Sequence, residues 1–173
     1  MLQSRWTRYL LIAVVLTTSV GCDQATKYMA REQLQHQPMV SLLGDTVRLF
    51  YTQNPGIAMS IGAEWSDTGR FLLTVVLAGI LLLGVLVGVL IKTPASPVAL
   101  LGYSIILGGG VSNLLDRLLR EHGVVDFMML KLGFFNTAVF NVADMLILGG
   151  VALLGWHHYR AGRPHAPLAA PEH

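Results

Sequence analysis

Two aspartates in apolar surroundings are the side chains of this sequence best suited to chemistry. Asp144 lies about two turns into an apolar stretch, in F-N-V-A-D-M-L-I-L, and Asp126 is flanked by apolar residues in V-V-D-F-M-M-L. An aspartate at the centre of a membrane span costs on the order of 2.5 to 3.5 kcal/mol, so one found there is a functional candidate. Two carboxyl groups in a poorly solvated site share a proton, and one acts as a base toward water while the other acts as an acid. This chemistry hydrolyses amides without a metal or a covalent intermediate.

The low charge of the chain indicates a membrane protein, in which spanning helices would position these acids. Of 173 residues, 53% are hydrophobic and 13% are charged, whereas a soluble domain carries about 25% charged residues. A spanning helix needs roughly 20 apolar residues. The sequence therefore predicts a mostly α membrane protein. Its expected parts are a single domain over 1–160, four transmembrane helices at about 8–28, 70–91, 97–116 and 137–158, and a disordered, proline-rich tail at 161–173.

The connection between the first two spans and the glycines of the spans carry further signals. Residues 40–60 contain short apolar segments separated by glycine, aspartate and proline, which predicts a few short strands. Gly84, Gly88, the run 108–110 and the pair 149–150 are predicted to let helices approach closely. Glycine is also common in membrane helices without such a role.

Charge and cysteine content exclude several function classes. A net charge of +2, from 12 basic and 10 acidic side chains, is too small and too dispersed for a nucleic-acid surface. Cys22 is the only cysteine, and the six histidines lack the H-E-x-x-H spacing of zinc proteases. The sequence therefore predicts no internal disulfide, no metal and no cofactor.

Four alternating spans bring the polar residues to one side of the membrane. The ends of the first and third spans and the starts of the second and fourth lie on that side, together with two connections. It carries Asp23, Lys27, Asn54, Asn113, Asp116, Arg117, Asp126, Asn141 and Asp144. Arg5 and Arg8 directly precede the first span and indicate a cytoplasmic N-terminus. Both termini are therefore predicted to be cytoplasmic, and the polar side is predicted to be extracytoplasmic.

Each polar residue also has a purely structural interpretation. Asp126 could cap a helix, and Asp116 with Arg117 could form an interfacial ion pair. Asn113 and Asn141 could hydrogen-bond between helices. These interpretations do not explain why all of the residues fall on one side.

The other two structural interpretations are local. Asp23 and Lys27 have the i, i+4 spacing of a helical ion pair. Asn54, followed by proline and glycine, could form only a turn.

Five sequence blocks resemble, in order, the signature blocks of bacterial lipoprotein signal peptidase, or signal peptidase II. The blocks are D-Q-A-T-K (Asp23 to Lys27), N-P-G-I-A-M-S (Asn54 to Ser60), S-N-L-L-D-R (Ser112 to Arg117), G-V-V-D-F (Gly123 to Phe127) and F-N-V-A-D (Phe140 to Asp144). The similarity extends over roughly residues 8–159. Five blocks in register with four spans carry the resemblance, which any single block would support only weakly.

The resemblance implies an aspartic endopeptidase of the bacterial cytoplasmic (inner) membrane, and we expect it to be a monomer. Such an enzyme has four helices, a small extracytoplasmic β-cradle, here 40–60, and a short amphipathic helix over the site. It cleaves prolipoproteins in membrane lipid just before the diacylglyceryl-modified cysteine, and the antibiotic globomycin is expected to inhibit it. By this similarity Asp126 and Asp144 form the catalytic dyad. Substrate-binding or supporting residues would be Asp23, Lys27, Asn54, Gly56, Asn113, Asp116, Arg117 and Asn141.

The chain departs from the family pattern in three places. Ser112 stands where glycine is common, and residues 137–139 read T-A-V where the family has a proline-bearing stretch. Pro55 stands where threonine is usual, and because proline fixes φ it bears on the orientation of Asn54. None of these departures removes the two acids.

Two other functions fit parts of the sequence. A small ion or proton transporter would use Asp144 as a relay, but it would carry acids near the bilayer midplane on several helices rather than at one end. Thr18 to Cys22, T-S-V-G-C, faintly resembles a lipobox in which Cys22 is itself lipid-modified. Ser19 stands where that motif prefers leucine.

Overall fold

The computed structural model describes residues 4–57, 61–92, 94, 96–120 and 123–162. Its elements are α1 (Arg5–Leu34), β1 (Val40–Leu42), β2 (Val47–Asn54), α2 (Asp67–Phe71), η2 (Leu72–Leu77), α3 (Ala78–Lys92), α4 (Pro97–Leu119), β3 (Val124–Leu132), β4 (Phe135–Asn136) and α5 (Val142–Ala161). The tail predicted to be disordered lies, from residue 163 onward, outside the described residues.

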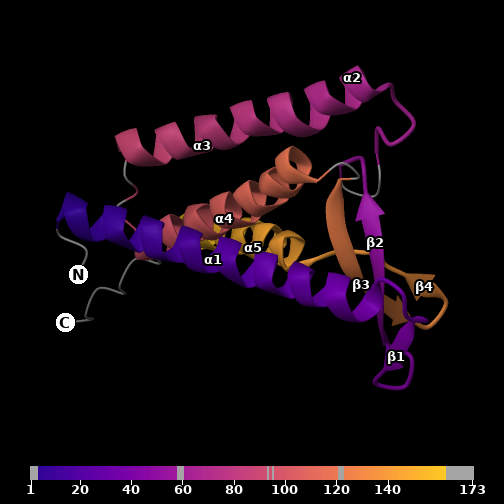
Figure 1. The fold of residues 1–173 in the computed structure, drawn as a ribbon. Helices are drawn as coiled ribbons and strands as arrows, with labels where there is room; N and C mark the ends of the chain where they lie inside the picture. The colour runs from indigo at the N-terminus through magenta and orange to yellow at the C-terminus, as the bar shows by residue number, and fades with distance from the viewer. Residues whose placement is uncertain (1–3, 58–60, 93, 95, 121–122, 163–173) are drawn as a thin grey trace, which may run out of the picture.

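The long helices run along one direction, and the sheet lies across one end of them (Figure 1). The π-helical segment η2 joins α2 to α3, so the second helical segment extends without a break from Asp67 to Lys92. Helix α4 is central and packs on α5, α1 and α3. As predicted from the alternation of the spans, α1 and α4 end at the sheet, and α2 and α5 begin there.

Among the described residues, three helical segments are long and apolar enough to cross a membrane: Arg5–Leu34, Asp67–Lys92 and Pro97–Leu119. The first continues well past Cys22, as predicted, and Cys22 is exposed on its surface. A mostly helical membrane protein with a small antiparallel sheet is therefore confirmed.

The sheet has the strand order β1-β2-β3-β4, and each neighbouring pair is antiparallel. The short strands predicted within 40–60 are confirmed for β1 and β2. The cradle boundary is nevertheless too narrow, because β2 pairs with β3 from the connection after α4, with Thr52 opposite Asp126. The interpretation of Asp126 as a helix cap is wrong, since this residue lies inside β3.

Helix α5 begins later than the predicted boundary at residue 137. The backbone N–H of Phe140 donates to the Met128 carbonyl at 2.8 Å, so the chain before α5 extends the sheet rather than the helix. The Asn141 side chain then accepts from the backbone N–H of Asp144 at 3.0 Å and starts the helix as its N-cap.

Only some of the glycines predicted to allow close approach do so. A Cβ added at Gly109 would lie 2.5 Å from the Ala143 carbonyl oxygen, and one at Gly150 would lie 2.8 Å from the Gly102 carbonyl oxygen. These two contacts hold α4 and α5 together backbone to backbone. Around Gly84 and Gly88 there is nothing within 4 Å, so the prediction is wrong for this pair.

We expect Gly109→Ala to lower the stability of the bundle, because the new methyl group meets backbone that has to move. Overpacking of this kind typically costs about 1–3 kcal/mol. Gly84→Ala is the matched control in an open helical position, where alanine is the better helix former. Melting temperatures in one detergent test this expectation, and equal values for the two variants would contradict it.

Candidate active site

Asn141 links the two acids singled out from the sequence. Its side-chain Nδ2 donates to Asp126 Oδ1 at 2.6 Å, and its backbone N–H donates to Asp144 Oδ2 at 3.1 Å. The second contact completes a capping box, in which Asp144 is the third residue of α5. The same local interaction that begins the helix therefore brings the carboxyl group from α5 to the one from β3.

Two further asparagines hold the remaining carboxylate oxygens. Asn113 Nδ2, from α4, donates to Asp144 Oδ1 at 2.9 Å. Asn54 Nδ2, at the end of β2, donates to Asp126 Oδ2 at 3.3 Å. Pro55 comes directly after β2, which ends at Asn54. The fixed φ of the proline therefore does not prevent the Asn54 side chain from reaching Asp126.

Asp126 is nearly inaccessible, with 3% of its surface exposed. Burial, followed by the negative charge of Asp144, raises the pKa of Asp126 to about 6, and hydrogen bonds from Asn141 and Asn54 oppose this rise. A carboxyl group with this pKa carries a proton for part of the time near neutral pH, as general acid catalysis requires.

A wholly buried ion cluster lies behind the two acids. Lys27 Nζ is 2.7 Å from Asp23 Oδ2 and 2.9 Å from Asp116 Oδ2, and all three side chains are at most 1% exposed. The lysine also donates to Asn113 Oδ1 at 2.8 Å. This contact fixes which end of the Asn113 amide faces Asp144, so the cluster orients a group that touches the acid.

The predicted pairing of Asp116 with Arg117 is wrong. Asp116 pairs with Lys27 and also with Arg120, whose Nε is 3.0 Å from Asp116 Oδ1. Arg117 leaves the helix on another side, and its guanidinium donates to the Gly56 carbonyl at 3.0 Å and to the Asn113 carbonyl at 3.3 Å. Arg117 therefore ties the loop after β2 to α4.

Two residues that the sequence analysis did not assign to the site belong to this cluster. Gln24 Nε2 donates to Asp116 Oδ1 at 2.9 Å and to Ser112 Oγ at 3.0 Å. Ser112 Oγ donates to Asp23 Oδ2 at 2.7 Å, so the serine at the usual glycine position adds a hydrogen bond. A polar glutamine within a spanning helix was the signal that could have identified Gln24.

Asp126, Asp144, Asn54, Asn113 and Arg117 line one cavity of about 540 Å³. The rest of its wall is largely apolar. Its apolar lining includes Leu81, Leu82, Ile147, Leu148 and Val151 from α3 and α5. The cavity therefore offers a pair of carboxyl groups beside a surface suited to hydrocarbon.

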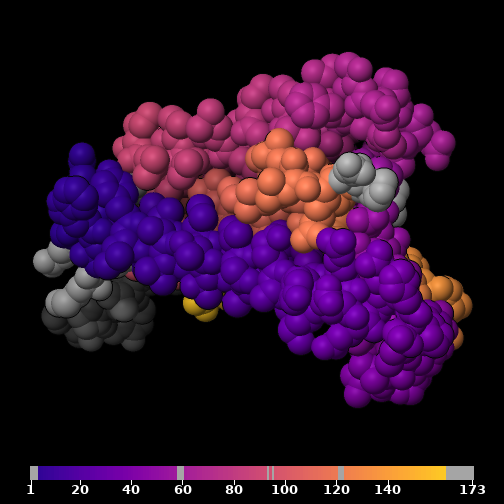
Figure 2. Space-filling view, viewed as in Figure 1, coloured from indigo at the N-terminus to yellow at the C-terminus, as the bar shows by residue number. Residues whose placement is uncertain are grey.

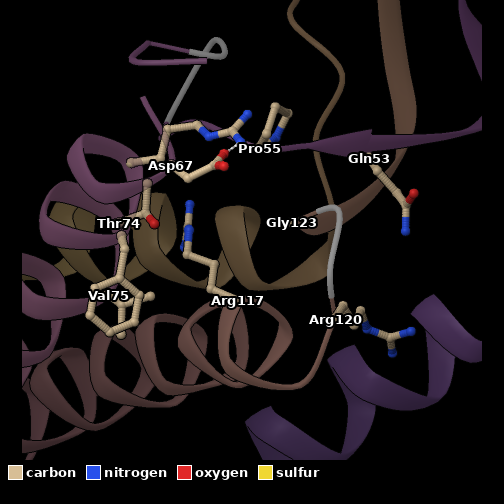
Figure 3. Close-up of a pocket in the computed structure, with 10 residues that line it drawn as sticks. Gln53, Pro55, Asp67, Thr74, Val75, Arg117, Arg120 and Gly123 are labelled. Atoms are coloured by element: carbon tan, nitrogen blue, oxygen red, sulfur yellow. Dashed lines mark hydrogen bonds and ion pairs between the residues drawn. The ribbon is translucent and has the colours of Figure 1, made fainter. Parts of the chain in front are cut away.

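A second cavity, of about 580 Å³, adjoins the end of β2 and the residue before β3 (Figure 3). We call it the outer cavity, and the cavity that contains the two acids the inner cavity. Gln53 and Pro55 line this outer cavity while Asn54 lines the inner one, as expected for alternating residues of a strand. Arg117 lines both cavities and points toward Thr74, whereas Arg120 points to the other side of Gly123 (Figure 3).

Gly123 permits the close approach of β3 to β2 at this wall. Its φ is +96°, and an added Cβ would lie 2.2 Å from the Asn54 carbonyl oxygen. Only glycine fits such a position. The short distance between strands brings Asn54 within reach of Asp126.

Comparison with known proteins identifies similar chains. A family model described as signal peptidase (SPase) II matches residues 12–160. A lipoprotein signal peptidase of Treponema denticola is 35% identical over 145 residues, which is 81% of each chain. One from Azoarcus sp. is 33% identical over 162 residues, covering 92% of this chain and 88% of the relative.

A third relative and a solved structure extend the comparison. The lipoprotein signal peptidase of Mycobacterium tuberculosis is 36% identical over 168 residues, covering 91% of this chain and 76% of the relative. A bacterial membrane enzyme solved at 2.3 Å has a TM-score of 0.77 at 19% identity, covering 93% of this chain and 94% of that chain. The latter likeness concerns the fold.

Proposed function

This chain belongs to the signal peptidase II family of membrane proteases, and we propose that it is an aspartic endopeptidase that uses Asp126 and Asp144. The proposed reaction removes the signal peptide of a prolipoprotein by cleavage just before the diacylglyceryl-modified cysteine. The single observation that carries the proposal is the pair of carboxyl groups that line one cavity and are joined through Asn141.

The proposed roles follow from the surroundings of the two acids. Asp126, whose pKa is raised to about 6, holds the shared proton, and ionised Asp144 is the base. Asp144 takes a proton from water, hydroxide adds to the scissile carbonyl carbon, and Asp126 protonates the carbonyl oxygen. The proton on Asp144 then passes to the amide nitrogen as the C–N bond breaks, and a hydroxyl proton of the intermediate returns to Asp126.

The apolar wall beside the acids supports a lipid-modified substrate. Leu81, Leu82, Ile147, Leu148 and Val151 line the same cavity as the dyad. A diacylglyceryl group attached next to the scissile bond would bury its hydrocarbon against such side chains.

We assign the other predicted site residues to supporting roles. Asn54, Asn113 and Asn141 orient the carboxyl groups. Arg117 fixes the loop at Gly56. The ion cluster of Asp23, Lys27 and Asp116 orients Asn113 from behind.

We further propose that α5 is a fourth span of a single domain over residues 1–160 in the bacterial inner membrane. Its 20 residues measure about 30 Å, which matches the hydrocarbon thickness. Trp6 and Tyr9 near the start of α1 and Trp156 and Tyr159 near the end of α5 suit a membrane interface at the end opposite the sheet. With Arg5 and Arg8 on the cytoplasmic side, the dyad faces the extracytoplasmic side and both termini are cytoplasmic.

A cleavage assay with the purified full-length chain tests the proposed function. Incubated with a diacylglyceryl prolipoprotein in detergent, it should release a product whose N-terminal residue is the modified cysteine, as mass spectrometry would detect. Globomycin should inhibit this reaction, and the chain is expected to act as a monomer. Cleavage at a different bond, or no cleavage of any prolipoprotein, would reject the proposal.

The pH dependence of cleavage should report the proton on Asp126. If the active form has Asp126 protonated, kcat/KM falls about tenfold per pH unit above its pKa of about 6. Asn54→Ala removes a hydrogen bond that lowers this pKa, so the fall should move to higher pH. Gln53→Ala, which changes the neighbouring residue facing the outer cavity, should leave the profile in place. A fall that moves to lower pH in Asn54→Ala would contradict the assignment.

A further inference from the structure

The free end of the sheet presents large apolar side chains to its surroundings. Two turns form this end, which we call the cradle tip: residues 42–47 between β1 and β2, and residues 132–135 between β3 and β4. Leu43 is 79% exposed and Phe134 is fully exposed. Other large apolar residues exposed in or beside these turns are Met39, Val40, Leu42, Leu132 and Phe135. Water-facing turns usually carry small or polar residues instead.

The backbone of the first turn holds a leucine where a polar residue or glycine is usual. Leu43 has φ of 50°, and Gly44 and Asp45 follow with φ of 63° and 71°. Few residues other than glycine, asparagine and aspartate adopt this region. The turn therefore presents an apolar side chain from a conformation that its residue type disfavours.

The charged groups of the cradle tip are tied to one another. Lys131 Nζ lies 2.6 Å from Asp45 Oδ2, and the Arg48 guanidinium makes two further hydrogen bonds to the same carboxylate, at 2.6 and 2.7 Å. The Lys131 backbone N–H also donates to the Thr46 carbonyl at 2.8 Å. These contacts fasten the first turn to β3 and leave Leu43 and Phe134 exposed.

The direction of the strands brings the β1 side of the cradle tip beside the sheet end of α1. Strands β2 and β3 run across the direction of the spanning helices, β1 lies to one side of the end of α1, and β4 lies beyond that end (Figure 1). In the space-filling view the β1 end projects past α1 (Figure 2). Tyr28 and Met29, near the end of α1, are 63% and 53% exposed, so the apolar surface of this helix continues toward the sheet. With the helices across the bilayer, the tip overhangs the lipid next to α1.

We propose that the cradle tip inserts Leu43 and Phe134 into the interfacial region of the leaflet at the sheet end of the helices. The partner of this surface is thus the lipid bilayer itself. Apolar side chains at such an interface bury about 5–10 Å into the boundary between headgroups and acyl chains. The anchored end belongs to β3, so insertion would also set the depth of the strand that carries Asp126.

Spin labelling tests the insertion directly and does not depend on catalysis. Because Cys22 is the only cysteine, Cys22→Ser provides a background for single labels at Leu43→Cys and Phe134→Cys. Gln37→Cys is the control at an exposed polar residue of the same end, and Ile80→Cys, 61% exposed on α3, is the lipid-exposed control. Each labelled full-length chain is reconstituted in vesicles of phosphatidylcholine and phosphatidylglycerol.

The ratio of collisions with oxygen to collisions with a water-soluble nickel chelate decides the outcome. For labels at 43 and 134 we expect a ratio several-fold above that at 37 and close to that at 80. A ratio equal to that at 37 would overturn the proposal. Spectral broadening that disappears on dilution with unlabelled chain would identify a second copy as the partner instead, and would also overturn it.

Discussion

Replacing Asp126 or Asp144 by asparagine is expected to lower kcat/KM for prolipoprotein cleavage by about 10³-fold or more, because general acid and base catalysis each contribute about 10²–10⁴-fold. Asparagine has the size of aspartate and keeps one oxygen that can accept from Asn141, while its amide nitrogen takes the place of the oxygen that accepts from Asn54 or Asn113. The variants should therefore fold, and their melting temperatures in detergent should fall only by the effect of that one lost hydrogen bond. The cleavage assay with a diacylglyceryl prolipoprotein gives the rate.

Two comparisons make this prediction specific to a pair of acids. Because the two carboxyl groups act as one unit, the double variant should be about as slow as either single variant rather than multiplicatively slower. Glu32→Gln, at an exposed position near the same end of α1, is the matched control and should cleave normally. A chelator should not inhibit the wild type. Near wild-type cleavage by either single variant would reject the dyad.

The sequence predicted the acids better than it predicted the elements that hold them. Asp144 was recognisable because an acid interrupts an apolar run, and Asp126 because apolar residues flank it on both sides. The strand around Asp126 was not recognisable, because its partner β2 lies about 70 residues earlier in the chain. Pairing between distant strands depends on the whole fold, and nothing local to residues 124–132 specifies its register.

The same limit applies to the buried ion cluster. The spacing of Asp23 and Lys27 predicted their ion pair, which the structure contains. The third member, Asp116, comes from α4, and the structural interpretation that paired it with its neighbour Arg117 is wrong. Rotation by about 100° per residue sends Asp116 and Arg117 to different faces of the helix, so adjacency in sequence works against such a pair.

Lys27→Met is expected to produce the largest loss of stability among the supporting residues. The lysine is 0% exposed and faces two buried carboxylates, Asp23 and Asp116. Removing one partner from a buried ion group leaves uncompensated charge and typically costs about 3–5 kcal/mol in free energy of unfolding. The variant should also cleave more slowly even where it is folded, because Asn113 Oδ1 loses a donor that orients its amide toward Asp144.

Two further variants separate charge compensation from the loss of a long side chain. Lys131→Met removes a lysine that is 35% exposed in its ion pair with Asp45, and it should leave the melting temperature nearly unchanged. Adding Asp116→Asn to Lys27→Met removes one of the two stranded charges, so the double variant should be more stable than additivity predicts. Thermal and denaturant unfolding in the same detergent measure both effects. If Lys27→Met were no more damaging than Lys131→Met, the cluster would not be what holds Asn113, and the orientation of its amide would have to depend on Asn141 Nδ2, which donates to Asn113 Oδ1 at 3.2 Å.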